Sequence, residues 1–75
     1  MDAYLRILAR EVSSDCDQGI KEKITAFVNA APGIKAVKRV DAHVRGGFSV
    51  MVDRDDVLPE SFATHFVAGE FMLVI

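Results

Sequence analysis

The chain has 75 residues, a hydrophobic fraction of 51% and a net charge of −2 from nine basic and eleven acidic side chains. The composition excludes intrinsic disorder, because half of the residues are able to enter a core, and the length predicts a single domain over residues 1–75. The small, well-mixed charge also excludes long-range attraction to nucleic acid or to an anionic membrane.

Two features predict the compartment. The sequence holds one cysteine, Cys16, which therefore has no partner for an internal disulfide, as is typical of a reducing compartment. Residues 1–4 lack the basic start of a signal peptide, and the longest apolar run, residues 71–75, is too short to span a bilayer. We therefore expect a cytoplasmic protein that does not bind a membrane.

The first predicted element is a strand over residues 3–12. Its side chains alternate between an apolar and a mixed face, which is the period of a strand. The apolar face would carry Leu5, Ile7 and Ala9, and the other face Arg6, Leu8 and Arg10.

A helix is predicted to follow. Ser13-Ser14-Asp15 supplies capping side chains, and Ser14 with Asp17 has a spacing similar to that of a capping box. Pro32-Gly33 would end the helix. The apolar residues between these signals share one helical face: Ile20, Ile24, Phe27, Val28 and Ala31.

Two strands are predicted around Gly46-Gly47. Their inward residues would be Val40, Ala42 and Val44 on the first strand and Phe48, Val50 and Val52 on the second. A two-residue loop would mix the two faces, so we predict a turn of three or five residues. With the three-residue turn, Val44 would pair with Phe48 and Ala42 with Val50.

The last predicted elements are a short helix and a strand. Pro59 suits the first position of the helix, Phe62 and Phe66 would form its inner face, and Gly69 would end it. Residues 71–75 would form the strand. The order strand–helix–strand–strand–helix–strand predicts an α+β, ferredoxin-like sandwich: a four-stranded antiparallel sheet with two helices on one face.

Several segments also match a known pattern. Cys16 precedes the first helix, Ala31-Pro32-Gly33-Ile34 follows it, and Gly69-Glu70-Phe71 leads into the last strand. In these features the chain resembles the heavy-metal-associated domain of copper chaperones and metal-pumping ATPases, whose metal loop reads Gly-Met-x-Cys-x-x-Cys. Gly19 stands at the place of the second cysteine and Ser14 at that of the methionine.

The resemblance implies a metal-handling alternative. One thiolate does not complete the linear coordination of a soft monovalent metal, so a partner would have to supply the other ligand. Cys16 is then the candidate metal ligand, and a metal ion is the one cofactor that we consider. Asp15, Cys16, Asp17, His43 and His65 show no chelating spacing, so we do not expect a zinc site.

Catalytic signals are missing from the sequence. We find no nucleophile–base pair, no paired carboxylates in an apolar setting and no phosphate-binding glycine loop. We therefore predict that the chain is not an enzyme.

The open face of the sheet would be rich in charge. It would carry Arg6, Leu8, Arg10, Arg39, Asp41, His43, Arg45, Ser49, Met51 and Asp53. Phe48 would point inward and Tyr4 would lie at the edge, so no aromatic ring would be placed to stack on a base. Binding of RNA or single-stranded DNA is therefore the weakest alternative.

The last strand points to a protein partner. If Phe71, Leu73 and Ile75 face the helices, Met72 and Val74 face outward, and with Leu8 and Met51 they would form an apolar strip. We expect an uncharged sheet edge without a proline or a tail to protect it. We therefore predict a non-catalytic interaction module that binds itself or another protein, with Arg6, Arg10 and Arg45 orienting the partner at the rim.

Overall fold

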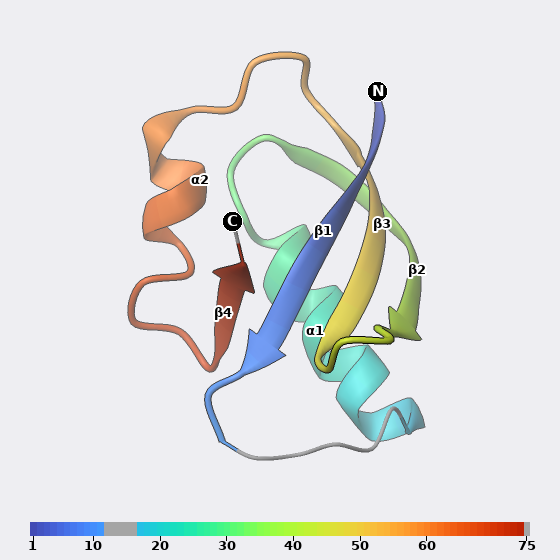
Figure 1. Cartoon of the computed structure of the whole chain (residues 1–75). Coiled ribbons are helices and arrows are strands. Elements are labelled where there is room, and N and C mark those ends of the chain that lie inside the picture. The colour runs from blue at the N-terminus through green and yellow to red at the C-terminus, as the bar shows by residue number, and fades with distance from the viewer. Residues whose placement is uncertain (12–16, 75) are drawn as a thin grey trace.

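The computed structural model describes residues 1–11 and 17–74. Its strands form one antiparallel sheet in the order β2-β3-β1-β4 (Figure 1). Along the chain the elements are β1 (Asp2–Ala9), α1 (Gln18–Asn29), β2 (Ile34–Ala42), β3 (Phe48–Arg54), α2 (Glu60–Thr64) and β4 (Phe71–Val74). This arrangement confirms the predicted α+β, ferredoxin-like fold.

Both helices contribute to one core on the same side of the sheet. In Figure 1, α1 lies behind the sheet and α2 lies on the β4 side. The ring of Phe27 on α1 lies 5.4 Å from those of Phe66 and Phe71, which joins α1 to the turn after α2 and to β4. The buried core residues are Ile7, Ile24, Val28, Ala31, Val40, Phe48, Val50, Val52, Phe62, Phe66 and Phe71. Most of the predicted inward positions are therefore confirmed, and the opposite side of the sheet is left open.

The described start of α1 differs from the predicted cap. Asp17 is the N-cap, and its Oδ1 accepts a hydrogen bond of 2.9 Å from the Ile20 N–H. The predicted capping residues, Ser13-Ser14-Asp15, lie outside the described residues. At the other end, Gly33 has a φ of +89°, a conformation that glycine adopts without strain, and the chain reverses there into β2.

The β2–β3 hairpin has a five-residue turn, residues 43–47, and Ala42 pairs with Phe48. The turn is closed by a hydrogen bond of 2.9 Å from the His43 N–H to the Gly47 carbonyl. One of the two predicted turn lengths is thus confirmed, whereas the pairing of Val44 with Phe48 was wrong by two residues. A shift of two residues keeps every side chain on its face, so the alternation did not distinguish the two registers.

That shift moves two residues out of the sheet. Val44 is 98% exposed in the turn and does not reach the core. His43, expected in mid-strand on the open face, also lies in the turn. Two boundaries differ as well: β1 ends at Ala9, short of residue 12, and Pro59 is the N-cap of α2 where the sequence predicted its first helical residue.

Candidate interaction surface

The open face of the sheet is organised by the register of β1, an interior strand. Tyr4 pairs with Met51 of β3, and Leu8 pairs with Met72 of β4. Between these pairs, Arg6 lies beside Ser49 on one side and beside Val74 on the other. Arg6 therefore interrupts the predicted apolar strip between Leu8 and Met51. The apolar neighbour of Met51 is instead Tyr4.

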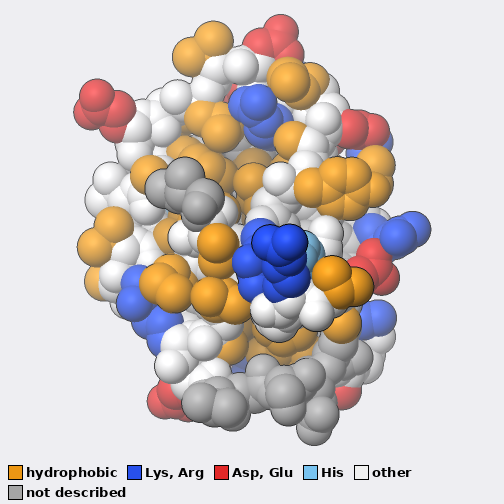
Figure 2. All heavy atoms as spheres, viewed as in Figure 1, with side chains coloured by type: hydrophobic (Ala, Val, Ile, Leu, Met, Phe, Trp, Pro, Cys, Tyr) orange, Lys and Arg blue, Asp and Glu red, His pale blue; other side chains and the backbone are white. Residues whose placement is uncertain are grey.

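We name Tyr4, Leu8, Met51, Met72 and Val74 the apolar group of the open face. Tyr4 is 66% exposed and Met72 40% exposed, while the other three are half-buried. Figure 2 views this face and shows hydrophobic side chains around a central cluster of basic ones. The apolar group therefore surrounds a charged centre and does not form an unbroken strip.

Tyr4 is an apolar neighbour that the predicted strip did not include. It was expected at the edge, and it has a strand neighbour on one side only: Tyr4 pairs with Met51 of β3, while the ladder between β1 and β4 covers Arg6 to Ala9. The signal for its orientation was present, because Tyr4 has the same parity as Arg6 and Leu8. The open face thus carries an exposed aromatic ring beside Met51.

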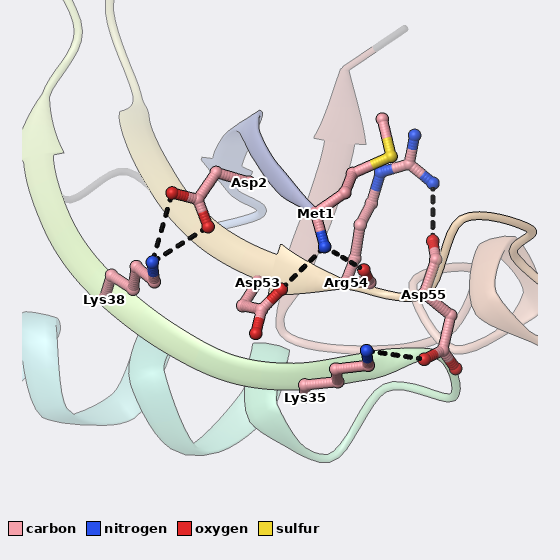
Figure 3. A network of polar contacts seen from close by, with 7 residues as sticks. All are labelled: Met1, Asp2, Lys35, Lys38, Asp53, Arg54 and Asp55. Atoms are coloured by element: carbon pink, nitrogen blue, oxygen red, sulfur yellow. Dashed lines mark hydrogen bonds and ion pairs between the residues drawn. The ribbon is translucent and has the colours of Figure 1, made fainter.

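The other half of the open face is polar, and its charges pair with each other (Figure 3). The N-terminal ammonium of Met1 lies 2.8 Å from Asp53 Oδ1, and its hydrogen bond holds the pKa of Asp53 below the ordinary value. Lys38 Nζ lies 2.8 Å from Asp2 Oδ1, and the hydrogen bond between them raises the pKa of Lys38. These ion pairs are exposed, so each contributes little to stability.

A third ion pair lies near Met51. Arg39 Nε donates to Asp41 Oδ2, which raises the pKa of Arg39. Arg39 pairs with Met51 across the β2–β3 ladder. Acidic and basic groups therefore alternate on this half, which opposes the binding of a phosphate backbone near Tyr4.

Two of the predicted rim arginines are bound to the protein's own backbone. Arg6 Nη2 donates to the carbonyls of Arg45 and Gly46 at 2.8 and 3.1 Å, and so joins β1 to the hairpin turn. Arg10 donates to three carbonyls between α2 and β4. The side chain of Arg45 is exposed on the turn. Arg45 is thus the predicted rim residue best placed to contact a partner.

Leu8 covers the hairpin turn. A Cβ atom on Gly47 would overlap Leu8 Cδ2 and would lie 2.5 Å from the Ile7 carbonyl oxygen. The close approach of Leu8 to Gly47 leaves this leucine half-buried. Leu8 therefore links the turn to Met72 on β4 and has less apolar area to offer than Met72.

β4 forms one outer edge of the sheet. The hydrogen bonds between β1 and β4 show which of its N–H and C=O groups point towards β1. The Arg10 N–H donates to the Glu70 carbonyl at 3.0 Å, so Arg10 and Glu70 form a hydrogen-bonded pair of the β1–β4 ladder. Because hydrogen-bonded and non-hydrogen-bonded pairs alternate in antiparallel sheets, the N–H and C=O groups of Phe71 and Leu73 point away from β1. Phe71 is 1% exposed, so its backbone groups are covered within the molecule, whereas Leu73 is half-buried.

A shallow groove of about 360 Å³ runs beside this edge, between β4 and α2. Its lining is mostly apolar, and Val67 is 69% exposed next to it. The lining residues are Arg10, Ala63, Phe66, Val67, Met72 and Leu73. The apolar surface therefore continues from the open face around β4.

The metal alternative gains no contact from the structure. Cys16, its candidate ligand, lies outside the described residues. His43 Nδ1 accepts a hydrogen bond of 3.0 Å from the Arg45 N–H, and His65 Nε2 donates to the Phe27 carbonyl at 2.7 Å. Within residues 1–11 and 17–74, no three His, Cys, Asp or Glu side chains are grouped to hold a metal ion.

Comparison of the chain with protein families, with curated proteins and with solved structures found no match. The resemblance to the heavy-metal-associated domain therefore stays a prediction. In the part of the chain that the structure describes, no helix has the length and apolar character needed to cross a membrane.

Proposed function

We propose that this chain is a non-catalytic protein-interaction module. It binds its partner through the apolar group of the open face and through the edge strand β4. The observation that carries the proposal is the uncharged strand β4, whose outward residue Met72 is 40% exposed on the open face beside Leu8. Exposed apolar surface that gathers on one face of a small domain is typical of a site for another protein.

The composition of the surface suits a protein partner. Tyr4 offers an exposed ring, and aromatic side chains are enriched in the centres of interfaces. Burying an apolar side chain completely contributes about 1.5–3 kcal/mol, so the partly exposed members of the group would each contribute less. Because association has costs of its own, the apolar group supports a moderate affinity rather than a tight one.

The charges of the molecule support a non-catalytic role. Within residues 1–11 and 17–74, the groups with a shifted pKa are Asp53, Lys38 and Arg39, and each takes part in an exposed ion pair on the sheet. Catalytic groups are instead tuned by burial and by charge within a cleft. We therefore assign these ion pairs to the structure of the sheet.

The proposal is tested by placing charge on the docking surface. Met72→Lys combined with Val74→Lys should reduce, by about tenfold or more, the amount of partner recovered with the affinity-tagged chain from its native cells, because two ammonium groups would have to be desolvated at the interface. Quantitative mass spectrometry measures the recovery, and circular dichroism checks the fold.

Val57→Lys is the matched control, since Val57 is 83% exposed in the connection between β3 and α2. This variant should recover the partner as the wild type does. Equal recovery by the double variant and by the wild type would contradict the proposed surface.

A further inference from the structure

We propose that the partner presents an acidic amphipathic helix, which lies along β1 on the open face of the sheet. The inference rests on the proposed function and names the chemistry of the partner. Three observations carry it: arginines of this face that form no ion pair among the described residues, apolar side chains beside them, and sheet edges that do not suit another strand.

The unbalanced positive charge of the open face belongs to Arg6, Arg10 and Arg45. Arg6 and Arg10 donate to backbone carbonyls, which are neutral and leave the charge of each guanidinium in place. Within residues 1–11 and 17–74, none of the three arginines forms an ion pair, whereas Lys38 and Arg39 on the β2 half are each paired with an aspartate. Figure 2 shows basic side chains in the middle of this face and acidic ones near its margin. Carboxylates of a partner would therefore complement the arginines.

Apolar side chains lie on both sides of the Arg6 position. Tyr4 pairs with Met51 on one side, and Leu8 pairs with Met72 on the other. Tyr4 and Leu8 are four residues apart on β1, which is about 13 Å along a strand and the length of about nine residues of helix. One short helix would therefore cover both apolar pairs with its apolar face. The carboxylates that flank this face would reach the arginines.

The helical form of the partner follows from the edges of the sheet. Phe71 of the edge strand β4 is 1% exposed, and the ladder of the other edge strand, β2, contains two register shifts. A covered edge and an irregular edge both oppose the addition of a strand. A segment that lies on a sheet face receives no backbone hydrogen bonds from the sheet, so its own N–H and C=O groups have to be paired internally, as they are in a helix.

Two other partners suit this face less well. In a second copy of this chain, the carboxylates of the same face, on Asp2, Asp41 and Asp53, are already paired with cations of their own chain. A second copy would therefore bring further unbalanced positive charge to the arginines. A nucleic acid would bring phosphates, which gain nothing from the apolar side chains of Leu8 and Met72 beside the arginines. A segment that combines carboxylates with apolar side chains complements both features.

The chemistry of the partner is tested with two synthetic helical peptides that have the same leucine face. The first peptide carries glutamates beside the leucines, and the second carries lysines at the same positions. In NMR titrations of the wild-type chain, the glutamate peptide should shift the amides of Arg6, Leu8 and Met72 and should bind about tenfold tighter than the lysine peptide. Equal binding of the two peptides, or no shift with the glutamate peptide, would overturn the inference.

Charge reversal tests whether the arginines form the contact. Arg45→Glu should weaken binding of the glutamate peptide by about tenfold, because an anion replaces an exposed cation on the turn. Lys35→Glu is the matched control, since it makes the same change of net charge at an exposed position of β2, and it should leave the binding nearly unchanged. Equal weakening by the two variants would mean that net charge causes the effect and would overturn the contact.

Photo-cross-linking in the native cells identifies the segment that lies on the open face. Benzoylphenylalanine replaces Tyr4, which is 66% exposed, and in the control it replaces Val57, which is 83% exposed in the connection between β3 and α2. At Tyr4 the cross-linked peptide, sequenced by mass spectrometry, should carry apolar residues at helical spacing with carboxylates beside them. At Val57 this peptide should not be found. A cross-link at Tyr4 to nucleic acid or to a second copy of this chain would overturn the inference.

The two proposals fail in different ways. If the segment cross-linked at Tyr4 belongs to another protein and carries no carboxylates, the acidic helix is wrong and the docking surface stands. Lysines at Met72 and Val74 would lie against the apolar face of the helix, so this double variant should lose the partner even if the helix is acidic. If Tyr4 gives no cross-link and the double variant recovers the partner fully, both the acidic helix and the docking surface are wrong.

Discussion

At the scale of single residues, the two glycines of the hairpin turn show how surroundings distinguish positions with similar backbones. Gly46 and Gly47 have φ angles of +92° and +76°, which L-residues rarely adopt. A Cβ atom on Gly46 would find no other atom within 4 Å, whereas one on Gly47 would overlap Leu8 and the backbone of Ile7. The same substitution therefore has different consequences at the two positions.

We predict that Gly47→Ala destabilises the domain more than Gly46→Ala. The positive φ alone costs about 1–2 kcal/mol, which is the effect expected for Gly46→Ala. At Gly47 the overlap with Leu8 adds about 1–3 kcal/mol of strain to the free energy of unfolding. Urea denaturation of the two variants measures the difference, and equal losses would contradict the contact between Leu8 and the turn.

Tyr4 shows what residue-level reasoning reaches and where it ends. Its parity with Arg6 and Leu8 is a local property, and it indicates an outward ring from the sequence alone. That the ring lies beside Met51 follows from the β1–β3 register, which joins segments more than 40 residues apart. The sequence therefore indicates orientation, and strand pairing decides the neighbour.

At the scale of elements, Arg10 holds the connection between α2 and β4. Its Nε lies 2.7 Å from the Gly69 carbonyl oxygen, and its Nη2 lies 2.7 Å from that of Val67 and 2.9 Å from that of Phe66. One guanidinium thus satisfies carbonyls at the end of a short helix and just before the edge strand. The position of β4 depends in part on this side chain.

We predict that Arg10→Gln loosens β4 more than the rest of the sheet. Lost hydrogen bonds from a charged donor to carbonyls should lower stability by about 1–2 kcal/mol at this largely exposed site. Amides of Met72 and Val74, which face β1, should exchange faster, while those between β2 and β3 should not. Hydrogen exchange followed by NMR measures both sets.

Arg45→Gln is the matched control for Arg10→Gln, because it removes an exposed guanidinium from the turn. It should leave exchange in β4 unchanged. The hypothesis that Arg10 positions β4 fails if the two variants behave alike. Arg10 was predicted as a rim residue from its charge, and its carbonyl partners, 56 to 59 positions further along the chain, are visible only in the fold.

At the scale of the whole molecule, charge and apolar surface are separated across the sheet. Paired charges of Met1, Asp2, Lys38 and Asp53 occupy the half of the open face nearest β2, whereas β4 carries none (Figure 3). This separation leaves β4 as the edge at which an apolar partner meets no charge. It also makes part of the stability of the sheet dependent on pH.

We predict that Asp53 contributes to stability at neutral pH and not in strong acid. Its pKa in the folded chain is held below the ordinary 3.8, first by the hydrogen bond from the N-terminal ammonium. A group whose pKa is lower in the folded chain stabilises the fold at pH values above its pKa in the unfolded chain. This contribution is lost as the pH falls through the pKa of the group in the folded chain. Asp53→Asn should therefore lower the urea midpoint at pH 6 and not at about pH 2.

The control for this prediction is Asp56→Asn, at an exposed position outside the network of Figure 3. Its midpoint should follow that of the wild type from pH 6 to about pH 2. If the deficit of Asp53→Asn stays constant over this range, the ion pair with the N-terminus does not contribute to folding.

The sequence by itself determined the order of elements, the inward face of each helix and the apolar side of each strand. These are local properties, because the period of two or 3.6 and the positions of Gly33, Pro32 and Pro59 are contained in short segments. The tertiary structure alone decided the hairpin register, the neighbours of Tyr4 and Met51, and the carbonyls that Arg10 binds. Strand pairing joins distant segments, and a two-residue shift keeps every side chain on its face, so the local pattern is the same for registers that build different surfaces.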